Sequence, residues 1–103
     1  MFTVVETHAA LEDLREPIAY LNYRTGGKQA GSNLLDAYER LIGLLEQTPY
    51  AFPLTLDPIV GSLGYRWARA GSYIVLYTVR EAEEAVITER VEHESRNWRA
   101  LLG

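Results

Sequence analysis

Three short runs of β-branched and aromatic residues follow one another closely toward the C-terminal end of the chain. They cover residues 64–69, 72–79 and 85–91, and only short breaks separate them. Runs of this kind are typical of antiparallel strands joined by turns. The break at Ala70-Gly71 is about two residues long, so the first two strands are expected to form a tight hairpin. These residues predict a three-stranded meander on which the rest of the chain must pack.

Alternation within the central run assigns the two faces of this sheet. Tyr73, Val75, Tyr77 and Val79 share one face, which we expect to pack on helices. The opposite row is Ile74, Leu76, Thr78 and Arg80. Because this second row ends in a charge, we expect it to form the more open face. Arg66 is expected to lie on the open face beside the small Ala68.

The N-terminal part of the chain predicts a strand and a first helix. Residues Phe2 to Glu6 alternate as a short strand does, and Thr7 is suited to cap the helix that follows. The apolar stripe of that helix is Leu11, Leu14, Ile18 and Leu21. Pro17 falls inside the pattern, so we expect a kink or a break near Arg15-Glu16, with two short helices as the alternative.

A second helix is predicted from about Lys28 to Gln47, after a turn at Thr25-Gly26-Gly27. Its apolar stripe is Leu34, Tyr38, Leu41 and Leu45. Gly31 and Ser32 lie early in this run, so a start as late as Asn33 is the alternative. Two helices with one apolar stripe each need a sheet to cover. The chain therefore predicts a single α+β domain over residues 1–103, in the order β-α-α-β-β-β, with an antiparallel meander sheet packed on a two-helix hairpin.

Residues 48–63 contain three prolines, which predicts an irregular crossing segment. Its apolar residues Phe52, Leu54, Leu56 and Ile59 are expected to lie on the surface of the core. Loops of this length without structure are uncommon, so we expect a strand or a helical turn within it. At the other end, residues Ser95 to Leu102 predict a short C-terminal helix capped by Ser95.

Composition narrows the classes of function. The chain has no cysteine, which excludes disulfides and thiolate metal sites and fits a reducing cytoplasm. The N-terminus lacks the basic and apolar regions of a signal peptide, and no run approaches the ~20 apolar residues that span a membrane. A net charge of −4 argues against non-specific nucleic-acid binding. No metal or organic cofactor is expected.

The order of these elements and three pieces of sequence together resemble the RelE/ParE superfamily of small bacterial toxins. The pieces are Gly64-Tyr65-Arg66, Tyr73-Ile74-Val75-Leu76-Tyr77 and the tail from Arg90 to Trp98. The resemblance implies a cytoplasmic toxin of a type II toxin–antitoxin pair, of the plasmid-stabilisation type. An antitoxin would hold it inactive, with a higher-order toxin–antitoxin complex as a further expectation. Family members are ribosome-dependent mRNA endonucleases, like RelE, or inhibitors of DNA gyrase, like ParE.

Two positions depart from the nuclease pattern that this resemblance implies. RelE-like nucleases have an arginine directly after the first tyrosine of their Tyr-x-x-x-Tyr strand, where this chain has Ile74. They also carry two cationic residues spaced two apart on the preceding strand, where this chain has Arg66 and Ala68. RNA cleavage needs stabilisation of the developing phosphorane charge as well as acid and base groups. The pattern therefore favours a ParE-like gyrase inhibitor. A RelE-like nuclease, and an inactive toxin that retains only antitoxin binding, are the alternatives.

The candidate site residues lie on the meander and the tail. The catalytic candidates are Arg66, His93 and Arg96, and the candidates for binding a target or an antitoxin are Arg66, Arg69, Arg96, Trp98 and Arg99. Imidazole can exchange a proton near neutral pH, and arginine suits phosphate and carboxylate partners.

Structural roles are the alternatives for several of these side chains. His93 would then hold the strand end, Arg66 would pair with a glutamate, and Trp98 would cover the core. Arg90 is expected to be a structural cross-strand charge. For the antitoxin, we expect a helical or extended segment to lie on the apolar surface left by the helix hairpin and the meander edge.

Overall fold

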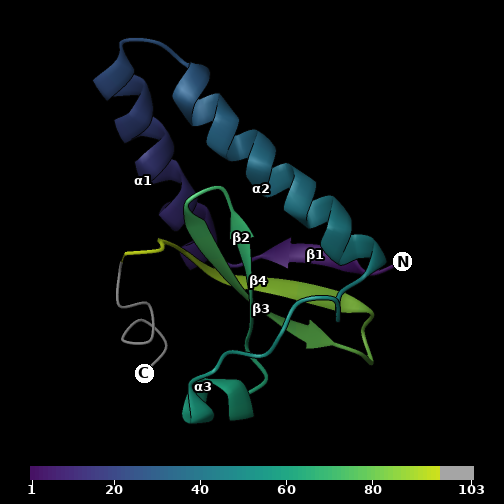
Figure 1. Ribbon diagram of the computed structural model, residues 1–103. Coiled ribbons are helices and arrows are strands. Elements are labelled where there is room, and N and C mark those ends of the chain that lie inside the picture. Colours follow the sequence, from purple (N-terminus) through teal and green to yellow (C-terminus); the bar gives the residue numbers. More distant parts are fainter. Residues whose placement is uncertain (96–103) are drawn as a thin grey trace.

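Seven elements follow one another within residues 1–95, the part of the chain that the computed structural model describes. They are β1 (Thr3–Glu6), α1 (His8–Thr25), α2 (Gln29–Gln47), α3 (Pro58–Ser62), β2 (Arg66–Ala70), β3 (Tyr73–Arg80) and β4 (Ala85–His93). Helices α1 and α2 form a hairpin whose tip projects beyond the sheet (Figure 1). The predicted α+β order is confirmed, with α3 added to it. The predicted C-terminal helix lies outside the described residues.

The four strands form one mixed sheet in the order β1-β4-β3-β2. Strands β2, β3 and β4 pair antiparallel, so the predicted meander is confirmed, and Gly71 takes a left-handed φ of 61° in its first turn. Strand β1 adds to β4 in parallel, with Thr3 opposite Ala85. Because β1 is shorter than β4, no strand within residues 1–95 pairs with the outer edge of β4 beyond Thr88.

A β-bulge in β4 lets side chains from both ends of that strand point to the same face of the sheet. Leu76 pairs with Arg90 while Tyr77 pairs with Thr88, so Glu89 is one extra residue. In a regular strand, Val86 and Val91 would point to opposite faces. With the bulge, both belong to the same hydrophobic core.

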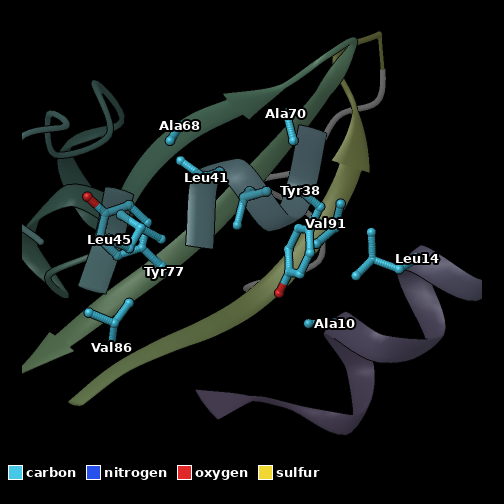
Figure 2. Close-up of a cluster of buried hydrophobic side chains, with 11 residues drawn as sticks. Ala10, Leu14, Tyr38, Leu41, Leu45, Ala68, Ala70, Tyr77, Val86 and Val91 are labelled. Atoms are coloured by element: carbon cyan, nitrogen blue, oxygen red, sulfur yellow. The ribbon is translucent and has the colours of Figure 1, made fainter. Parts of the chain in front are cut away.

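The core lies between the hairpin and the sheet (Figure 2). Its buried members come from every layer: Ala10, Leu14, Tyr38, Leu41, Leu45, Ala68, Ala70, Val75, Tyr77, Val86 and Val91. Tyr73 and Val79 pack against this cluster. The helix-facing row predicted for β3 is therefore confirmed.

The prediction of an open second face is wrong for two residues. Ile74 and Leu76 lie on the face away from the hairpin and are nevertheless buried. Their directly opposite neighbours in β2, Arg69 and Trp67, are large, and side chains at such positions are close enough to shield one another. The prediction that Arg66 lies beside Ala68 on the open face is also wrong. Both belong to the helix-facing row of β2, because Ala68 lies opposite Val75 and Arg66 lies opposite Tyr77.

Helix α1 runs from His8 to Thr25 without interruption, so the predicted break near Arg15-Glu16 and the alternative of two short helices are wrong. Thr7 caps it as predicted: its hydroxyl accepts from the Ala10 N–H at 3.0 Å and donates to the Glu89 carbonyl at 2.8 Å. The late start for the second helix is wrong too, since α2 begins at Gln29. Contacts with α2 and β4 hold α1 together across the proline.

The crossing segment contains both kinds of local structure expected there. Leu54 forms an isolated bridge with Arg66, and α3 is capped by the Asp57 carboxylate, which accepts from two backbone N–H groups. Phe52 packs against the core as predicted. Leu54, Leu56 and Ile59 instead face solvent. Of these, Ile59 lies on α3, which projects away from the sheet (Figure 1).

Candidate functional site

Arg66 is used to hold the crossing segment against the sheet. Its Nη1 donates to the Phe52 carbonyl at 2.6 Å, and its guanidinium lies 5.1 Å from the centre of the Tyr50 ring. The Tyr50 hydroxyl in turn donates to Glu81 in the turn before β4. This chain of contacts gives Arg66 a structural role, although its predicted partner was a glutamate.

The two positions that carry cations in RelE-like nucleases are buried and apolar here. Ala68 is 2% exposed and Ile74 is 5% exposed, and they lie on opposite faces of the sheet. A charged group at either position would need a buried partner. Arg66 therefore has no second cation beside it at these positions.

His93 closes the turn after β4. Its Nδ1 accepts from the Ser95 N–H at 3.2 Å and lies 2.8 Å from the Ser95 hydroxyl, and its ring meets Tyr73 edge-on at 5.3 Å. His93 lies opposite Tyr73, whereas Arg66 lies opposite Tyr77 on the other side of β3. These positions differ by four residues, or about 13 Å along the strand, so the fold does not bring the two catalytic candidates together.

The remaining candidates are Arg69 and the tail. Arg69 is exposed at the end of β2, where it forms an ion pair with Glu94 and lies 5.9 Å from the centre of the Trp67 indole. Arg96, Trp98 and Arg99 lie outside the described residues. Arg90 has a structural role, but its partner is Asp13 in α1 rather than a cross-strand glutamate.

Two adjoining hollows between α2 and the end of β2 form an apolar groove that residue patterns alone did not locate. One holds about 300 Å³ and the other about 370 Å³, and they share Ala37 and Gly71. We call this the α2–β2 groove; its other lining residues are Leu21, Asn33, Leu34, Arg40, Leu41, Leu44, Phe52, Arg69, Ala70, Ser72, Tyr73 and His93. A sequence signal that points to it is Leu44, an exposed apolar residue of α2 outside the stripe of Leu34, Tyr38, Leu41 and Leu45.

The outer edge of β2 borders the α2–β2 groove. The Trp67 N–H donates to the Pro53 carbonyl at 3.2 Å, so the crossing segment covers that end of the edge. Backbone groups two residues further along a strand point the same way. The N–H and C=O of Arg69 therefore also point outward, and β2 is the last strand on that side of the sheet formed by residues 1–95.

A second groove lies between α1 and the outer edge of β4. It holds about 290 Å³, and we call it the α1–β4 groove; its lining residues are Asp13, Glu16, Pro17, Tyr20, Tyr73, Val91, Glu92 and His93. Three of these are carboxylates, and none is a lysine or an arginine. This groove has the opposite character to the α2–β2 groove, which is apolar and includes two arginines.

Neither a metal site nor a membrane span is found in residues 1–95. No group of three His, Cys, Asp or Glu side chains there is arranged to hold a metal ion. None of the helices in the same range combines the length and apolar character needed to cross a bilayer.

Comparison with known proteins identifies one matching family. The sequence model of a family described as the ParE toxin of the type II toxin–antitoxin system, parDE, matches residues 4–98. No curated protein sequence matches the chain.

Three solved structures share the fold. A chain of the RelBE2 toxin–antitoxin complex from Mycobacterium tuberculosis is 24% identical, with a TM-score of 0.59, over 89% of this chain and 96% of that one. A chain of the chromosomal ParDE toxin–antitoxin system from P. aeruginosa is 15% identical, with a TM-score of 0.67, over 90% and 96%. YafQ from E. coli is 16% identical, with a TM-score of 0.57, over the full length of both chains.

Proposed function

Because the chain belongs to the ParE toxin family of type II toxin–antitoxin systems, we propose that it arrests growth by binding DNA gyrase and is neutralised by a cognate antitoxin. The observation that carries the proposal is the match to the ParE family over residues 4–98. Binding to DNA gyrase and neutralisation by an antitoxin would both take place in the cytoplasm. Its contacts with the target come from Arg69, Arg96, Trp98 and Arg99, the exposed or terminal members of the candidate set.

The arrangement of the strands supports binding over RNA cleavage. Arg66 is held by Phe52 and Tyr50, and Ala68 and Ile74 supply no charge for a phosphorane intermediate. His93 is held by Ser95 at the other end of β3. Catalysis by these residues would require charge stabilisation and proton transfer at one reacting phosphate, which their separation does not favour.

Purified protein added to DNA gyrase and relaxed plasmid should stop supercoiling. A variant with Arg96→Ala, Trp98→Ala and Arg99→Ala should lose this inhibition, whereas Arg15→Ala, an exposed arginine on α1, should keep it. Unchanged supercoiling together with codon-phased cuts in cellular mRNA would show the RelE-like alternative instead. Normal growth on overexpression, with tight antitoxin binding, would show an inactive toxin.

The α2–β2 groove is where we place the antitoxin segment. Its apolar lining suits the apolar face of a helix, and the outward backbone of Arg69 suits an extended strand. Arg40 and Arg69 at its rim favour acidic side chains beside those apolar anchors. The partner is expected to be encoded by the neighbouring reading frame, as a short protein with a DNA-binding N-terminus.

A matched pair of variants on α2 tests this placement. Leu44 lines the groove and Leu35 does not, although both are exposed. Leu44→Asp should weaken binding to the neighbouring gene product by about 100-fold, the loss typical of a central apolar anchor. Leu35→Asp should change affinity less than about threefold, as expected for a residue outside the interface. Equal effects of the two variants would place the antitoxin elsewhere.

A further inference from the structure

The end of the helix hairpin lies beyond the hydrophobic core. Leu14 is the last buried residue of α1, and the helix continues for about three more turns to Thr25. We call residues 20–28 the hairpin tip, which extends past the sheet (Figure 1). Packing of the core therefore does not explain the side chains that this segment carries.

Hydrogen bonds hold the backbone of the hairpin tip in one shape. Gly26 ends α1 with a left-handed φ of 73°, and its N–H donates to the Asn22 carbonyl at 3.1 Å. The Asn22 Oδ1 accepts the Gly31 N–H at 3.1 Å, and the Thr25 hydroxyl donates to the Leu21 carbonyl at 2.9 Å. A surface that is already ordered loses less conformational entropy when it binds a partner.

The side chains that the hairpin tip presents are aromatic and cationic. Tyr20 is 56% exposed and Tyr23 is 88% exposed, and their spacing of three residues makes them neighbours on the surface of α1. Arg24 and Lys28 are exposed as well. No side-chain hydrogen bond or ion pair within residues 1–95 uses any of these four side chains. Tyrosine and arginine are enriched among the residues that dominate the energy of protein–protein interfaces.

The charge of the hairpin tip is opposite to that of the rest of the chain. No aspartate or glutamate occurs between Glu16 and Asp36, so Arg24 and Lys28 give this stretch a charge of +2. Because the net charge of the chain is −4, the remaining residues carry −6. Such an arrangement directs the tip toward an acidic partner. Two cations are few for a nucleic acid, whose binding depends on contacts with many phosphates, so the charge favours an acidic protein surface.

The hairpin tip adjoins the point where the C-terminal tail begins. Tyr20 and His93 line the α1–β4 groove together, and Leu21 and His93 line one hollow of the α2–β2 groove. Strand β4 therefore ends beside the base of the tip, and the tail that follows it contains the target-binding candidates Arg96, Trp98 and Arg99. We propose that the hairpin tip contacts an acidic surface on the protein target of the toxin, as a second part of the target-binding surface. This inference rests on the proposed function in so far as the chain is a toxin with a target.

The first test measures inhibition of gyrase supercoiling by variants of the hairpin tip. Tyr23→Ala and Arg24→Glu should each raise the concentration needed for half-inhibition by about tenfold. Arg80→Ala, which changes an exposed arginine at the far end of β3, should leave it within about twofold of the wild type. Thermal unfolding should be nearly the same in all three variants, because the side chains are exposed. Full inhibition by both tip variants would overturn the proposal.

The second test asks whether another partner occupies the hairpin tip. Binding of the neighbouring gene product should be unchanged in Tyr23→Ala and Arg24→Glu, since we place the antitoxin in the α2–β2 groove. A tenfold loss of antitoxin affinity in these variants would overturn the assignment to the target. Binding of a fluorescently labelled DNA duplex by the wild-type protein alone, if Arg24→Glu abolished it, would show a nucleic-acid surface and would overturn the acidic protein as occupant.

Growth arrest on overexpression separates this inference from the proposed function. If the wild type arrested growth without inhibiting gyrase, gyrase would not be the target and the proposed function would fail. The combined variant Tyr23→Ala with Arg24→Glu should still relieve the arrest at equal protein level, whereas Arg80→Ala should not. Arrest that this combined variant leaves intact would overturn the role of the hairpin tip, whatever the target. A wild type that neither arrests growth nor inhibits gyrase would overturn both proposals.

Discussion

Asp13 and Arg90, which are 77 residues apart in the chain, form a two-point ion pair that fastens α1 to the outer edge of β4. The Arg90 Nε donates to Oδ2 at 2.7 Å and its Nη2 donates to Oδ1 at 3.0 Å. The same Oδ2 accepts the Val91 N–H at 2.9 Å. The Asp13 side chain thereby takes the place of a neighbouring strand where β1 no longer reaches, and the hydrogen bond to Asp13 raises the pKa of Arg90.

Removing this carboxylate should destabilise the fold. The side chains of Asp13 and Arg90 are only 10% and 24% exposed, so Asp13→Ala leaves a largely buried guanidinium and a backbone N–H without their acceptor. The free energy of unfolding should fall by about 3 kcal/mol, measured by urea denaturation. Adding Arg90→Met should recover part of the loss, because the unpaired charge is then gone.

Glu12→Ala on the same helix is the control for this measurement. Glu12 pairs with Arg15 at 2.8 Å, but both side chains are exposed. Such a pair contributes little, so stability should change by about 0.5 kcal/mol or less. Equal losses of stability in Asp13→Ala and Glu12→Ala would contradict the proposed role of the Asp13–Arg90 ion pair in fastening α1 to β4.

Two buried tyrosines should make the free energy of unfolding fall at alkaline pH. Burial raises the pKa of Tyr38 and of Tyr77 to about 12, and their hydroxyls bind Thr88 and the Pro49 carbonyl. In the unfolded chain these groups ionise near pH 10, so stability is fully present below about pH 10 and falls as the pH rises toward 12. The expected slope is about −1.4 kcal/mol per pH unit for each tyrosine.

Urea denaturation at pH 9, 10 and 11 measures this slope. Tyr77→Phe should lower stability at every pH, since it removes the hydrogen bond to Pro49, and should also make the slope shallower. Tyr23→Phe is the control, because that tyrosine is 88% exposed on α1 and its substitution should leave the slope unchanged. If Tyr77→Phe left the slope unchanged, groups other than Tyr77 would be the cause of the pH dependence.

Helix α2 has one buried and one exposed leucine three residues apart. Leu41 is 3% exposed within the core and Leu44 is 53% exposed above the α2–β2 groove. Leu41→Ala should lower the free energy of unfolding by about 2–5 kcal/mol because it leaves a cavity, whereas Leu44→Ala should change it by about 0.5 kcal/mol. A larger loss of stability for Leu44→Ala than for Leu41→Ala would mean that the buried face of α2 is wrongly assigned.

The helices, the meander and its helix-facing row could be predicted because each depends on local periodicity. Tyr73, Val75 and Tyr77 are two residues apart, and the apolar stripe of α2 recurs every three or four residues. The bulge at Glu89 could not be found this way, because it exists only relative to the pairing of β3 with β4. The buried positions of Ile74 and Leu76 likewise depend on which side chains lie opposite them.

The candidate site was harder to predict for a related reason. Arg66 and Arg90 were recognised as charged residues on strands, but their partners, the Phe52 carbonyl and Asp13, are fixed only by tertiary structure. Local propensity disfavours Pro17 inside a helix and predicts a kink or a break near Arg15-Glu16. Contacts of α1 with α2 and β4 outweigh that cost, and Pro17 lines the α1–β4 groove without ending the helix.

Two glycines in α2 should respond to alanine in opposite directions. A Cβ on Gly31 would lie 2.5 Å from the Asn22 Oδ1, which accepts the Gly31 N–H at 3.1 Å and so links α1 to α2. At Gly43, apart from the adjacent backbone of its own helix, no atom of residues 1–95 lies within 4 Å of the Cβ position. Gly31→Ala must displace the Asn22 side chain and break that hydrogen bond, so it should cost about 1 kcal/mol despite the better helix propensity of alanine.

Gly43→Ala should stabilise the protein by about 0.5–1 kcal/mol, since it lowers the entropy of the unfolded chain and meets no obstacle in the fold. Asn22→Ala with Gly31→Ala provides the decisive comparison. Removing the obstructing amide should let the alanine fit, so the double variant should be more stable than the sum of the two single changes predicts. Thermal denaturation of the four variants measures this coupling, and additive effects would show that the helices are not in contact at Gly31.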